Sequence, residues 1–441
     1  MRLNRPSRYI AILRLAIPIV IAQLGSILQG WADTIMVGQY GTPELSAAGF
    51  VNNVFNLCIY FLLGISYATT PIVGSLFSQR KYGKVWQTLR ESNVVNLLAS
   101  LVVMLCLYIL YLNIDALGQP QELLPLIQPY FIVLLLSLPF LALFNSMKQF
   151  SDALGNTKTP MWVMIGGNVV NIILNYRLIF LLDMGLLGAG IATLISRALM
   201  AIAIWMLIGK RTANTPQSTI PISIAPSRQG MLSLFRLGLP ISVQLCLEAS
   251  SFNVSALFMG WLGATALAAH QVMGTVCTLA FMVVYGIGAA AAIRIAHYRG
   301  VGEWNEVRHT AQAAFILSCI IDAILVTVIC LAGRPIAHIF TTSHEVTALF
   351  LSFLPALICY QIGDCMQIIY ANALRAIESV KAMMLYAVIA YVFVSIPLAY
   401  IFAFPLRMGA VGIWWSFPFG LTTAGLCYYF QFRRQVRQRT S

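Results

Sequence analysis

The stretch Leu13-Arg14-Leu15-Ala16-Ile17-Pro18 recurs 222 positions later as Phe235-Arg236-Leu237-Gly238-Leu239-Pro240, and the residues after both copies stay in register. Further pairs at this offset are Val37-Gly38-Gln39-Tyr40-Gly41 with Met259-Gly260-Trp261-Leu262-Gly263, Gly64 with Gly286, Ala68 with Ala290, and Gly190-Ile191 with Gly412-Ile413. The chain is therefore one unit duplicated. In an apolar chain, two matched halves suggest a transporter whose halves rock between inward-open and outward-open states.

The composition predicts that this chain lies in a lipid bilayer. Of 441 residues, 59% are hydrophobic and 9% charged, and the mean hydropathy is +0.82. Apolar runs of roughly 20 residues are long enough to cross the hydrocarbon core as helices. Six are expected near 12–36, 46–78, 92–112, 126–148, 160–182 and 188–208. Six more are expected near 234–260, 266–294, 312–332, 349–373, 382–404 and 409–430. The second and eighth runs are longer than a membrane crossing requires.

Lys and Arg predict the orientation. When the twelve spans are threaded alternately from a cytoplasmic N-terminus, 23 of the 27 Lys and Arg residues fall on the cytoplasmic side. Segments 113–125 and 261–269, on the opposite side, carry none. This is the positive-inside pattern, and it predicts that both termini are cytoplasmic. The net charge of +13 is then a signal of topology and of attraction to anionic headgroups, and it does not indicate nucleic-acid binding.

The duplication predicts two lobes of six helices each. Because each half contains an even number of spans, both halves begin on the same side, and their symmetry axis lies along the membrane normal. We expect an N-terminal lobe at 1–208, a polar cytoplasmic linker at 209–233, a C-terminal lobe at 234–441, and a central cleft between the lobes. No soluble domain and no cleaved signal peptide are expected, because the first apolar run belongs to the repeat.

The cysteines and histidines do not predict a metal centre or a cofactor. The nine cysteines lie almost wholly inside apolar runs without a C-x-x-C motif, and the five histidines are dispersed. The cysteines are therefore interpreted as small hydrophobic residues rather than as ligands. No nucleophile and base cluster near a membrane interface either, which argues against an integral membrane enzyme.

Three carboxylates at membrane depth are the strongest functional candidates: Asp33 in the first span, Glu248 in the seventh and Asp364 in the tenth. An ionisable group there usually faces a wet cavity and binds something. Each lies on a polar stripe at helical spacing. The stripes are Gln23, Ser26, Gln29 and Asp33; Gln244, Glu248, Ser251 and Ser255; and Tyr360, Asp364 and Gln367. Three further stripes are Asn168, Asn171 and Asn175; Asn52, Asn53, Asn56 and Tyr60; and Gln271, Thr275, Thr278 and Tyr285.

The alternative for the neutral side chains is interhelical hydrogen bonding, which membrane bundles commonly use. That reading suits Glu248 and Asp364 less well, because an unpaired acid packs poorly and neither stripe contains a Lys or Arg. Asp33 is closer to an interface, where solvation is easier. Asp322 in the ninth span is expected to be structural. Arg197 in the sixth span is expected to pair with Asp33 or another carboxylate.

The residues resemble the multidrug and toxic compound extrusion (MATE) transporters, and within them the NorM-like branch. In the first half the resemblance rests on Asp33-Thr34-Ile35-Met36-Val37-Gly38, Thr70-Pro71 and Asn171-x-x-Leu174-Asn175-Tyr176. In the second half it rests on Met259-Gly260-Trp261-Leu262-Gly263, Ala268-Ala269-His270-Gln271, and Asp364-x-x-Gln367 followed by Leu374-Arg375. Each motif is short, but their order and spacing extend over nearly the whole chain.

The resemblance implies two lobes around a V-shaped cleft and export of organic cations or amphiphiles, driven by inward Na⁺ or H⁺. It assigns a cation site to Glu248 and Asp364, with Tyr360 nearby, and a separate acidic site to Asp33 beside Asn171 and Asn175. We expect Glu248, Asp364, Asp33 and Tyr360 to take part in cation coupling. Any Na⁺ would bind at Glu248 and Asp364. The further residues that we expect to line the substrate cleft are Gln23, Gln244, Ser251, Gln271, Gln367, Asn56, Tyr285 and Arg197. We expect a monomer in the plasma membrane with no cofactor other than the coupling ion.

A lipid-linked oligosaccharide flippase of the same superfamily is the alternative function. Such a cleft should be cationic to receive a pyrophosphate, whereas this chain places acids on the first, seventh and tenth spans and only Arg197 deep inside. The acids therefore favour a cationic substrate. A coupling ion and a cationic drug can both neutralise the same carboxylates, so the two should compete, as antiport requires.

Overall fold

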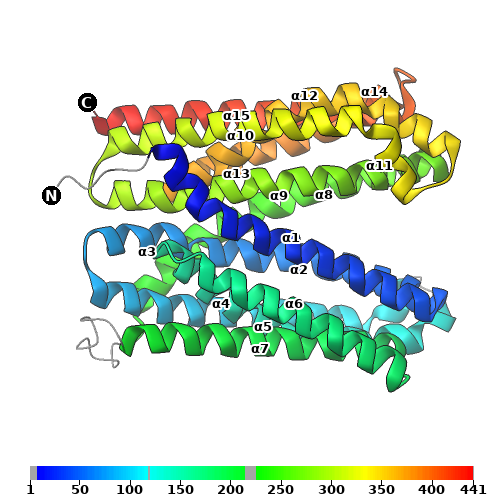
Figure 1. Ribbon diagram of the computed structural model, residues 1–441, viewed down its shortest axis with the longest axis horizontal. Coiled ribbons are helices and arrows are strands. Elements are labelled where there is room, and N and C mark those ends of the chain that lie inside the picture. Colours follow the sequence, from blue (N-terminus) through cyan, green and yellow to red (C-terminus); the bar gives the residue numbers. More distant parts are fainter. Residues whose placement is uncertain (1–6, 118–119, 214–224, 441) are drawn as a thin grey trace. The chain divides into compact units, whose positions relative to one another are not determined.

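The computed structural model describes residues 7–117, 120–213 and 225–440, and most of these residues are helical (Figure 1). The helices of the first half are α1 (Arg8–Tyr40), α2 (Thr42–Tyr67), α3 (Thr69–Ser78), α4 (Tyr82–Leu112), α5 (Leu124–Ala153), α6 (Lys158–Tyr176) and α7 (Gly185–Ala213). Two 3-10 turns, Ile114–Leu117 and Gln121–Leu123, precede α5, and a π-helical turn at Arg177–Leu181 extends α6.

The second half repeats this pattern of long helices. Its helices are α8 (Arg228–Leu262), α9 (Ala264–Gly300), α10 (Trp304–Leu331), α11 (Gly333–Phe340), α12 (His344–Ala376), α13 (Val380–Ala387), α14 (Ile396–Ala403) and α15 (Gly409–Thr440). The π-helical segment Val388–Ser395 joins α13 to α14 without a loop. Each of the twelve predicted spans therefore coincides with a helix or with a continuous run of helices.

Eleven of these helical runs, among the described residues, are long and apolar enough to cross a membrane. The two longest are Thr42–Ser78 and Ala264–Gly300, each of 37 residues, which are the second and eighth runs of the sequence. The twelfth span, α15, is also long, but Gly, Ser and Thr lower its hydropathy. Many of its side chains are buried, including Trp414, Phe417 and Tyr428, so it packs mainly against protein.

A proline causes the break between α2 and α3. Pro71 has no N–H to donate to the carbonyl four residues earlier, at Tyr67. The helix ends there, and Ala68 instead donates its N–H to the carbonyl of Ile65 at 3.3 Å. The Thr70-Pro71 motif thus falls in the first turn of α3, where the missing N–H of a proline is tolerated.

The chain forms two compact units, one of Met1–Val20 with Val243–Ser441 and the other of Ile21–Ser242. Both boundaries lie inside a helix, two residues after Pro18 in α1 and Pro240 in α8. Val20 and Ser242 are also separated by the repeat offset of 222 residues. The lobes predicted at 1–208 and 234–441 stay a prediction, and they differ from these units in where residues 1–20 and 234–242 belong. Part of the predicted linker, residues 214–224, lies outside the described residues.

In each unit a glycine allows close packing between two helices at the boundary residue, Val20 or Ser242. In the first unit, a Cβ on Gly286 of α9 would lie 2.4 Å from Cγ2 of Val20. In the second unit, a Cβ on Gly64 of α2 would lie 2.3 Å from Cα of Ser242. Ser242 also donates its hydroxyl to the carbonyl of Phe61 at 2.6 Å. Because Gly64 and Gly286 are repeat equivalents, the duplication conserves this close helix packing in both units.

Polar contacts fix the beginnings of α1 and α8 within the same units. Arg8 at the start of α1 pairs with Glu306 of α10 at 3.0 Å. The backbone N–H and the hydroxyl of Ser227, just before α8, both donate to Oε1 of Glu91 on α4, at 3.0 and 2.6 Å. Ser227 in turn caps α8, accepting from the backbone N–H of Gly230 at 3.0 Å. The part of α1 up to Val20 and the part of α8 up to Ser242 are therefore each held at both ends within their unit.

Each unit has its own apolar core. The core of the first unit joins α9, α12 and α15 around Trp414, whose ring lies 5.5 Å from that of Phe353 and 5.3 Å from that of Phe417. The core of the second unit joins α2, α4 and α5, with the rings of Phe55 and Phe131 4.9 Å apart. The polar stripes lie on helices of these two packed units.

Candidate functional site

Glu248, on α8 in the first unit, is held by two amide groups. Gln244, one turn earlier, donates from Nε2 to Glu248 Oε2 at 2.8 Å, and Gln367 of α12 donates to the same oxygen at 3.1 Å. The other carboxylate oxygen, Oε1, accepts no hydrogen bond from the described part of the chain. The amides therefore orient the carboxylate and leave one oxygen available to a ligand.

Asp364, on α12, has no such support. Its side chain is 4% exposed, yet no hydrogen-bond donor and no ion-pair partner reaches it from any described residue. Its charged neighbours are two further acids, Glu248 and Asp322, whose fields act on it. A buried carboxylate without a donor is unfavourable on its own, since burying charge requires a compensating partner. Asp364 is therefore the group in this site that most needs a bound cation or proton.

Tyr360 and Gln367 lie one turn before and one turn after Asp364 on the same helix. The ring of Tyr360 packs against those of Trp414 and Phe417, at 6.5 and 6.3 Å between centroids. Gln367 is 2% exposed, and its Oε1 is buried without a hydrogen-bond partner in the described chain. Carboxylate and amide oxygens are the ligand type that hard cations prefer. These oxygens form a donor set suited to a small cation.

Arg375 supplies a positive charge that the sequence pattern did not predict in this site. It is 6% exposed at the end of α12 and donates from Nη2 to Gln244 Oε1 at 2.5 Å. Gln244 is thus hydrogen-bonded both to the Arg375 guanidinium and to the Glu248 carboxylate. Arg375 and Gln244 are 131 residues apart, so no local spacing could have revealed the contact. The Leu374-Arg375 motif was its only signal.

Asp33 forms a second polar cluster, in the other unit. Gln29 donates from Nε2 to Asp33 Oδ2 at 3.0 Å and to Asn171 Oδ1 at 3.0 Å. Asn175 donates to Asp33 Oδ1 and to Asn171 Oδ1. Asn171 and Asn175 are each 1% exposed, whereas Asp33 is half-buried. Both Asp33 oxygens accept hydrogen bonds, so this carboxylate is better satisfied within the protein than Asp364 is.

The remaining cleft candidates lie outside both hydrogen-bonded clusters. Arg197 donates to the hydroxyl of Ser137 at 2.7 Å and forms no ion pair with Asp33, although its charge acts on Asp33. Ser251 donates to the hydroxyl of Ser395 at 3.4 Å. Tyr285 stacks on Phe281. The half-buried Gln23 and the exposed Asn56 and Gln271 complete the predicted set.

Asp322 lies next to the first cluster, and its expected structural role stays a prediction. It is 5% exposed on α10 and accepts from Nε2 of Gln361 on α12 at 3.0 Å. Gln361 lies one turn before Asp364 on α12. No group of three or more His, Cys, Asp or Glu side chains that could hold a metal ion occurs among the described residues.

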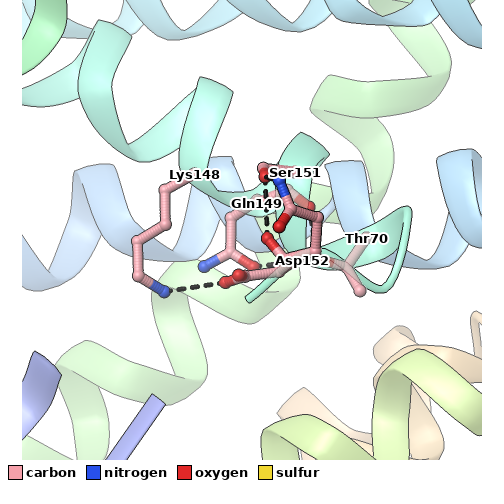
Figure 2. Close-up of polar contacts among 6 residues, drawn as sticks. Thr70, Lys148, Gln149, Ser151 and Asp152 are labelled. Atoms are coloured by element: carbon pink, nitrogen blue, oxygen red, sulfur yellow. Dashed lines mark hydrogen bonds and ion pairs between the residues drawn. The ribbon is translucent and has the colours of Figure 1, made fainter. Parts of the chain in front are cut away.

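The Thr70-Pro71 motif lies beside a buried ion pair in the second unit (Figure 2). Lys148 and Asp152, one turn apart on α5, are 2.9 Å apart, with 12% and 5% of their side chains exposed. Thr70 of α3 donates to Oε1 of Gln149 at 2.8 Å (Figure 2). The motif therefore joins α3 to α5 next to this pair.

In a comparison with known families, one family model matches each half of the repeat. The family model described as MatE matches residues 18–177 and again 240–401, so its two matches start at the repeat-equivalent Pro18 and Pro240. A model described as lipid II flippase MurJ matches residues 121–238.

The similar proteins span nearly the whole chain. A probable multidrug resistance protein NorM of Bradyrhizobium diazoefficiens is 30% identical, covering 98% of this chain and 94% of its own length. A multidrug resistance protein NorM of Burkholderia vietnamiensis is 30% identical, covering 95% and 92%. Two solved structures are similar: an outward-facing multidrug resistance MATE transporter (TM-score 0.88, 20% identity, 99% and 97% covered) and a MATE protein in complex with MaL6 (TM-score 0.87, 22% identity, 99% and 98% covered). This likeness confirms the predicted all-helical, twelve-span fold.

Proposed function

The chain belongs to the MatE family of membrane transporters, and from this membership we propose that it is a secondary active antiporter for multidrug efflux. It is a multi-pass membrane protein and a transporter rather than an enzyme. Its substrates are small organic cations and amphiphilic compounds, exported in exchange for an inward-moving Na⁺ or H⁺. The two halves of the repeat, 1–208 and 234–441, act as the lobes that alternate in access.

One observation carries the choice of coupling site. Asp364 is buried without a donor from the described chain, beside a Glu248 that keeps one oxygen free of hydrogen bonds. Two neighbouring carboxylates in a low-dielectric environment repel each other and attract any cation that can enter. The coupling ion therefore binds at Glu248 and Asp364, where its charge offsets that of the two carboxylates. Tyr360 and Gln367 supply the remaining oxygens.

Exchange follows from competition for these carboxylates. A coupling ion and a cationic drug each neutralise the same negative charge, so binding of one weakens binding of the other. The differential affinity of the two conformations for ion and drug then determines which state is populated. The cluster of Asp33, Asn171 and Asn175 is a separate polar site in the first half, where Asp33 is a further cation-coupling residue and the two asparagines contact substrate.

Efflux from proteoliposomes tests this function. The purified protein is reconstituted with a fluorescent cationic dye, and either a Na⁺ gradient with the pH gradient collapsed or a pH gradient without Na⁺ is imposed. At least one gradient should accelerate dye export above that of protein-free liposomes. Stimulation by the first alone assigns Na⁺, and stimulation by the second alone assigns H⁺. No stimulation by either gradient would refute cation-coupled antiport.

The orientation and the location are parts of the same proposal. The distribution of Lys and Arg supports cytoplasmic N- and C-termini, because positively charged loops are retained on that side. We place the transporter in the plasma membrane as a monomer. Labelling of an engineered terminal cysteine in intact cells, compared with opened cells, measures the orientation. Labelling in intact cells would contradict it.

Lipid flipping is the second candidate, and the MurJ match at 121–238 is the observation that favours it. Arg197 lies within the matched segment and could meet a phosphate. The carboxylates at Glu248, Asp364 and Asp33 oppose an anionic substrate, so we rank this function below drug efflux. Transfer of a labelled lipid pyrophosphate across the reconstituted bilayer, without export of the cationic dye, would reverse the ranking.

A further inference from the structure

A cavity of about 240 Å³ lies in the first unit where α10 begins and α15 ends. These two helices contact each other, although the end of α10 at Leu331 and the start of α15 at Gly409 are 78 positions apart in sequence. Neither helix end takes part in the candidate cation site, whose residues lie on α8 and the later part of α12. The cavity is therefore a separate feature of the fold.

Three arginines from the two helices line this cavity. Arg308 comes from the second turn of α10, and Arg433 and Arg437 lie one turn apart near the end of α15. Neutral donors stand beside them: Asn305 and Gln312 on the same face of α10, and Thr440 on α15. All six side chains can donate hydrogen bonds, and none of the ten described lining residues is acidic.

Two of the three arginines that line this cavity, Arg308 and Arg433, are not neutralised by any described side chain. Neither Arg308 nor Arg433 has an ion pair or a hydrogen bond with any described residue. The acid closest in sequence to Arg308 on α10, Glu306, is bound by Arg8 through two contacts of 3.0 and 3.2 Å. Like charges brought together on facing helices are unfavourable. An anion between the two helices would remove this repulsion, and a planar guanidinium binds phosphate oxygens in pairs.

The inner part of the cavity is apolar and aromatic. Tyr370 and Phe432 are each 3% exposed, and their ring centroids are 5.7 Å apart. Tyr429 packs against Tyr370 with its centroid at 5.1 Å. A cationic rim above an aromatic floor matches a ligand with a phosphate at one end and a hydrocarbon segment beside it.

The position along the helix agrees with the level of lipid headgroups. The 32 residues of α15 extend over about 48 Å, whereas the hydrocarbon core is roughly 30 Å thick. The final turns, which carry Arg433 and Arg437, therefore extend beyond the hydrocarbon region. Basic pockets between helices at the cytoplasmic surface are suited to anionic headgroups.

We propose that this pocket, lined by Arg308, Arg433 and Arg437, binds the phosphate group of an anionic phospholipid. The chemistry that it recognises is a phosphate monoanion or dianion, which a free phosphate shares. The aromatic floor favours the lipid as the source. The site is independent of ion coupling, because it uses none of the residues of the candidate cation site.

Lipid binding to the purified full-length transporter tests the proposal. Native mass spectrometry measures retained phosphatidylglycerol and phosphatidylcholine, and inorganic phosphate is added as a competitor. The wild type should retain phosphatidylglycerol in preference to phosphatidylcholine. In the variant Arg308→Gln/Arg433→Gln, phosphatidylglycerol affinity should fall by about 30-fold, since each basic residue at an anionic headgroup contributes close to a fivefold factor.

A matched control and a conservative variant separate binding from folding. Arg434→Gln removes an exposed charge on the same turn of α15 that does not line the pocket, and it should leave lipid retention unchanged. Arg308→Lys/Arg433→Lys should keep most of the affinity. If the double Gln variant does not purify, either single Gln variant should weaken retention by about fivefold.

The competitor identifies the source of the phosphate. Phosphatidylglycerol binding that inorganic phosphate displaces only at much higher concentration supports a lipid site. Equal displacement supports a site for free phosphate with the same arginines. Equal retention of phosphatidylglycerol by the wild type and by the Arg308→Gln and Arg433→Gln variants, single or combined, with no effect of inorganic phosphate, would overturn the proposal.

Discussion

At the scale of single residues, what local spacing predicts and what it misses can be separated. The i, i+4 spacing of Gln244 and Glu248 predicted that they share a face, and they are joined by a hydrogen bond. The contacts from Gln367 to Glu248 and from Arg375 to Gln244 bring together residues more than 100 positions apart. No periodicity specifies such pairs, because they depend on how two helices pack. The expected pairing of Arg197 with Asp33 is not formed as an ion pair.

Gln367→Leu tests the geometry of the coupling site without removing a carboxylate. The substitution keeps the side-chain volume approximately but removes the donor to Glu248 and the buried Oε1. The apparent affinity for the coupling cation should fall by about tenfold or more, because a hydrogen bond to a charged group contributes about 1.5–3 kcal/mol. Dye efflux measured against cation concentration gives this affinity.

Gln361→Leu is the matched control for this substitution. Gln361 lies on the same helix and is also buried, but its amide donates to Asp322 instead. The cation affinity of this variant should stay within about twofold of the wild type. Equal losses in both variants would indicate a general effect on α12, and the assigned role of Gln367 would then be wrong.

At the scale of elements, apolar runs and prolines predict helices well and predict their ends poorly. The span predicted at 126–148 is α5, which continues to Ala153 through the charged residues Lys148 and Asp152. A hydropathy pattern ends where charges begin, whereas the helix continues because the two charges pair with each other on its buried face. The break at Ala68 follows from Pro71 and could be located from the sequence alone.

Replacing Lys148 with Met tests the buried ion pair shown in Figure 2. Removal of the ammonium leaves Asp152 as a buried, uncompensated charge, which destabilises by about 3–5 kcal/mol. The thermal unfolding temperature of the purified protein should therefore fall clearly. In Lys148→Met/Asp152→Leu most of the loss should be recovered, because an apolar pair replaces both charges. A double variant no more stable than the single variant would contradict this account.

Two glycines allow close helix packing: Gly64 against Ser242 of α8, and Gly286 against Val20 of α1. Gly64→Ala would drive a methyl group into the backbone of Ser242, and overpacking of this kind costs about 1–3 kcal/mol. Gly286→Ala would meet Val20 in the equivalent position. Both variants should unfold at lower temperature than the wild type.

Each glycine has a control on its own helix. A methyl group added at Gly49 on α2 or at Gly274 on α9 would have no atom within 4 Å other than its own helix backbone and chain neighbours. Alanine at these sites should leave the unfolding temperature unchanged or raise it, since alanine is the better helix former. Equal destabilisation at all four positions would show that the close approach is not what distinguishes Gly64 and Gly286.

At the scale of the whole molecule, the repeat predicted the helix count but not how the chain divides into compact units. The chain passes from one unit to the other after Val20 and after Ser242, inside α1 and α8, rather than in the linker. Hydropathy cannot locate such a division, because it contains no information on which helices contact each other. The offset of 222 residues nevertheless relates the two exchange points, so the duplication extends from sequence motifs to packing.

The functional groups do not follow this symmetry. At the repeat offset, Glu248 corresponds to Ser26, and Asp33 corresponds to Ser255. The first unit contains the two carboxylates beside Gln367, and the other unit contains Asp33 among asparagines. A common scaffold thus carries two chemically different sites, and we assign the main coupling site to Glu248 and Asp364.

The most direct test of cation coupling at Glu248 and Asp364 is gradient-driven dye export from proteoliposomes by the wild type, Glu248→Gln and Asp364→Asn. Both substitutions keep the side-chain shape and remove the charge that would bind the coupling cation. The wild type should export the dye, and both variants should fall to the level of protein-free liposomes while being incorporated in equal amounts. Gradient-driven export by both variants at the wild-type rate would contradict the assignment.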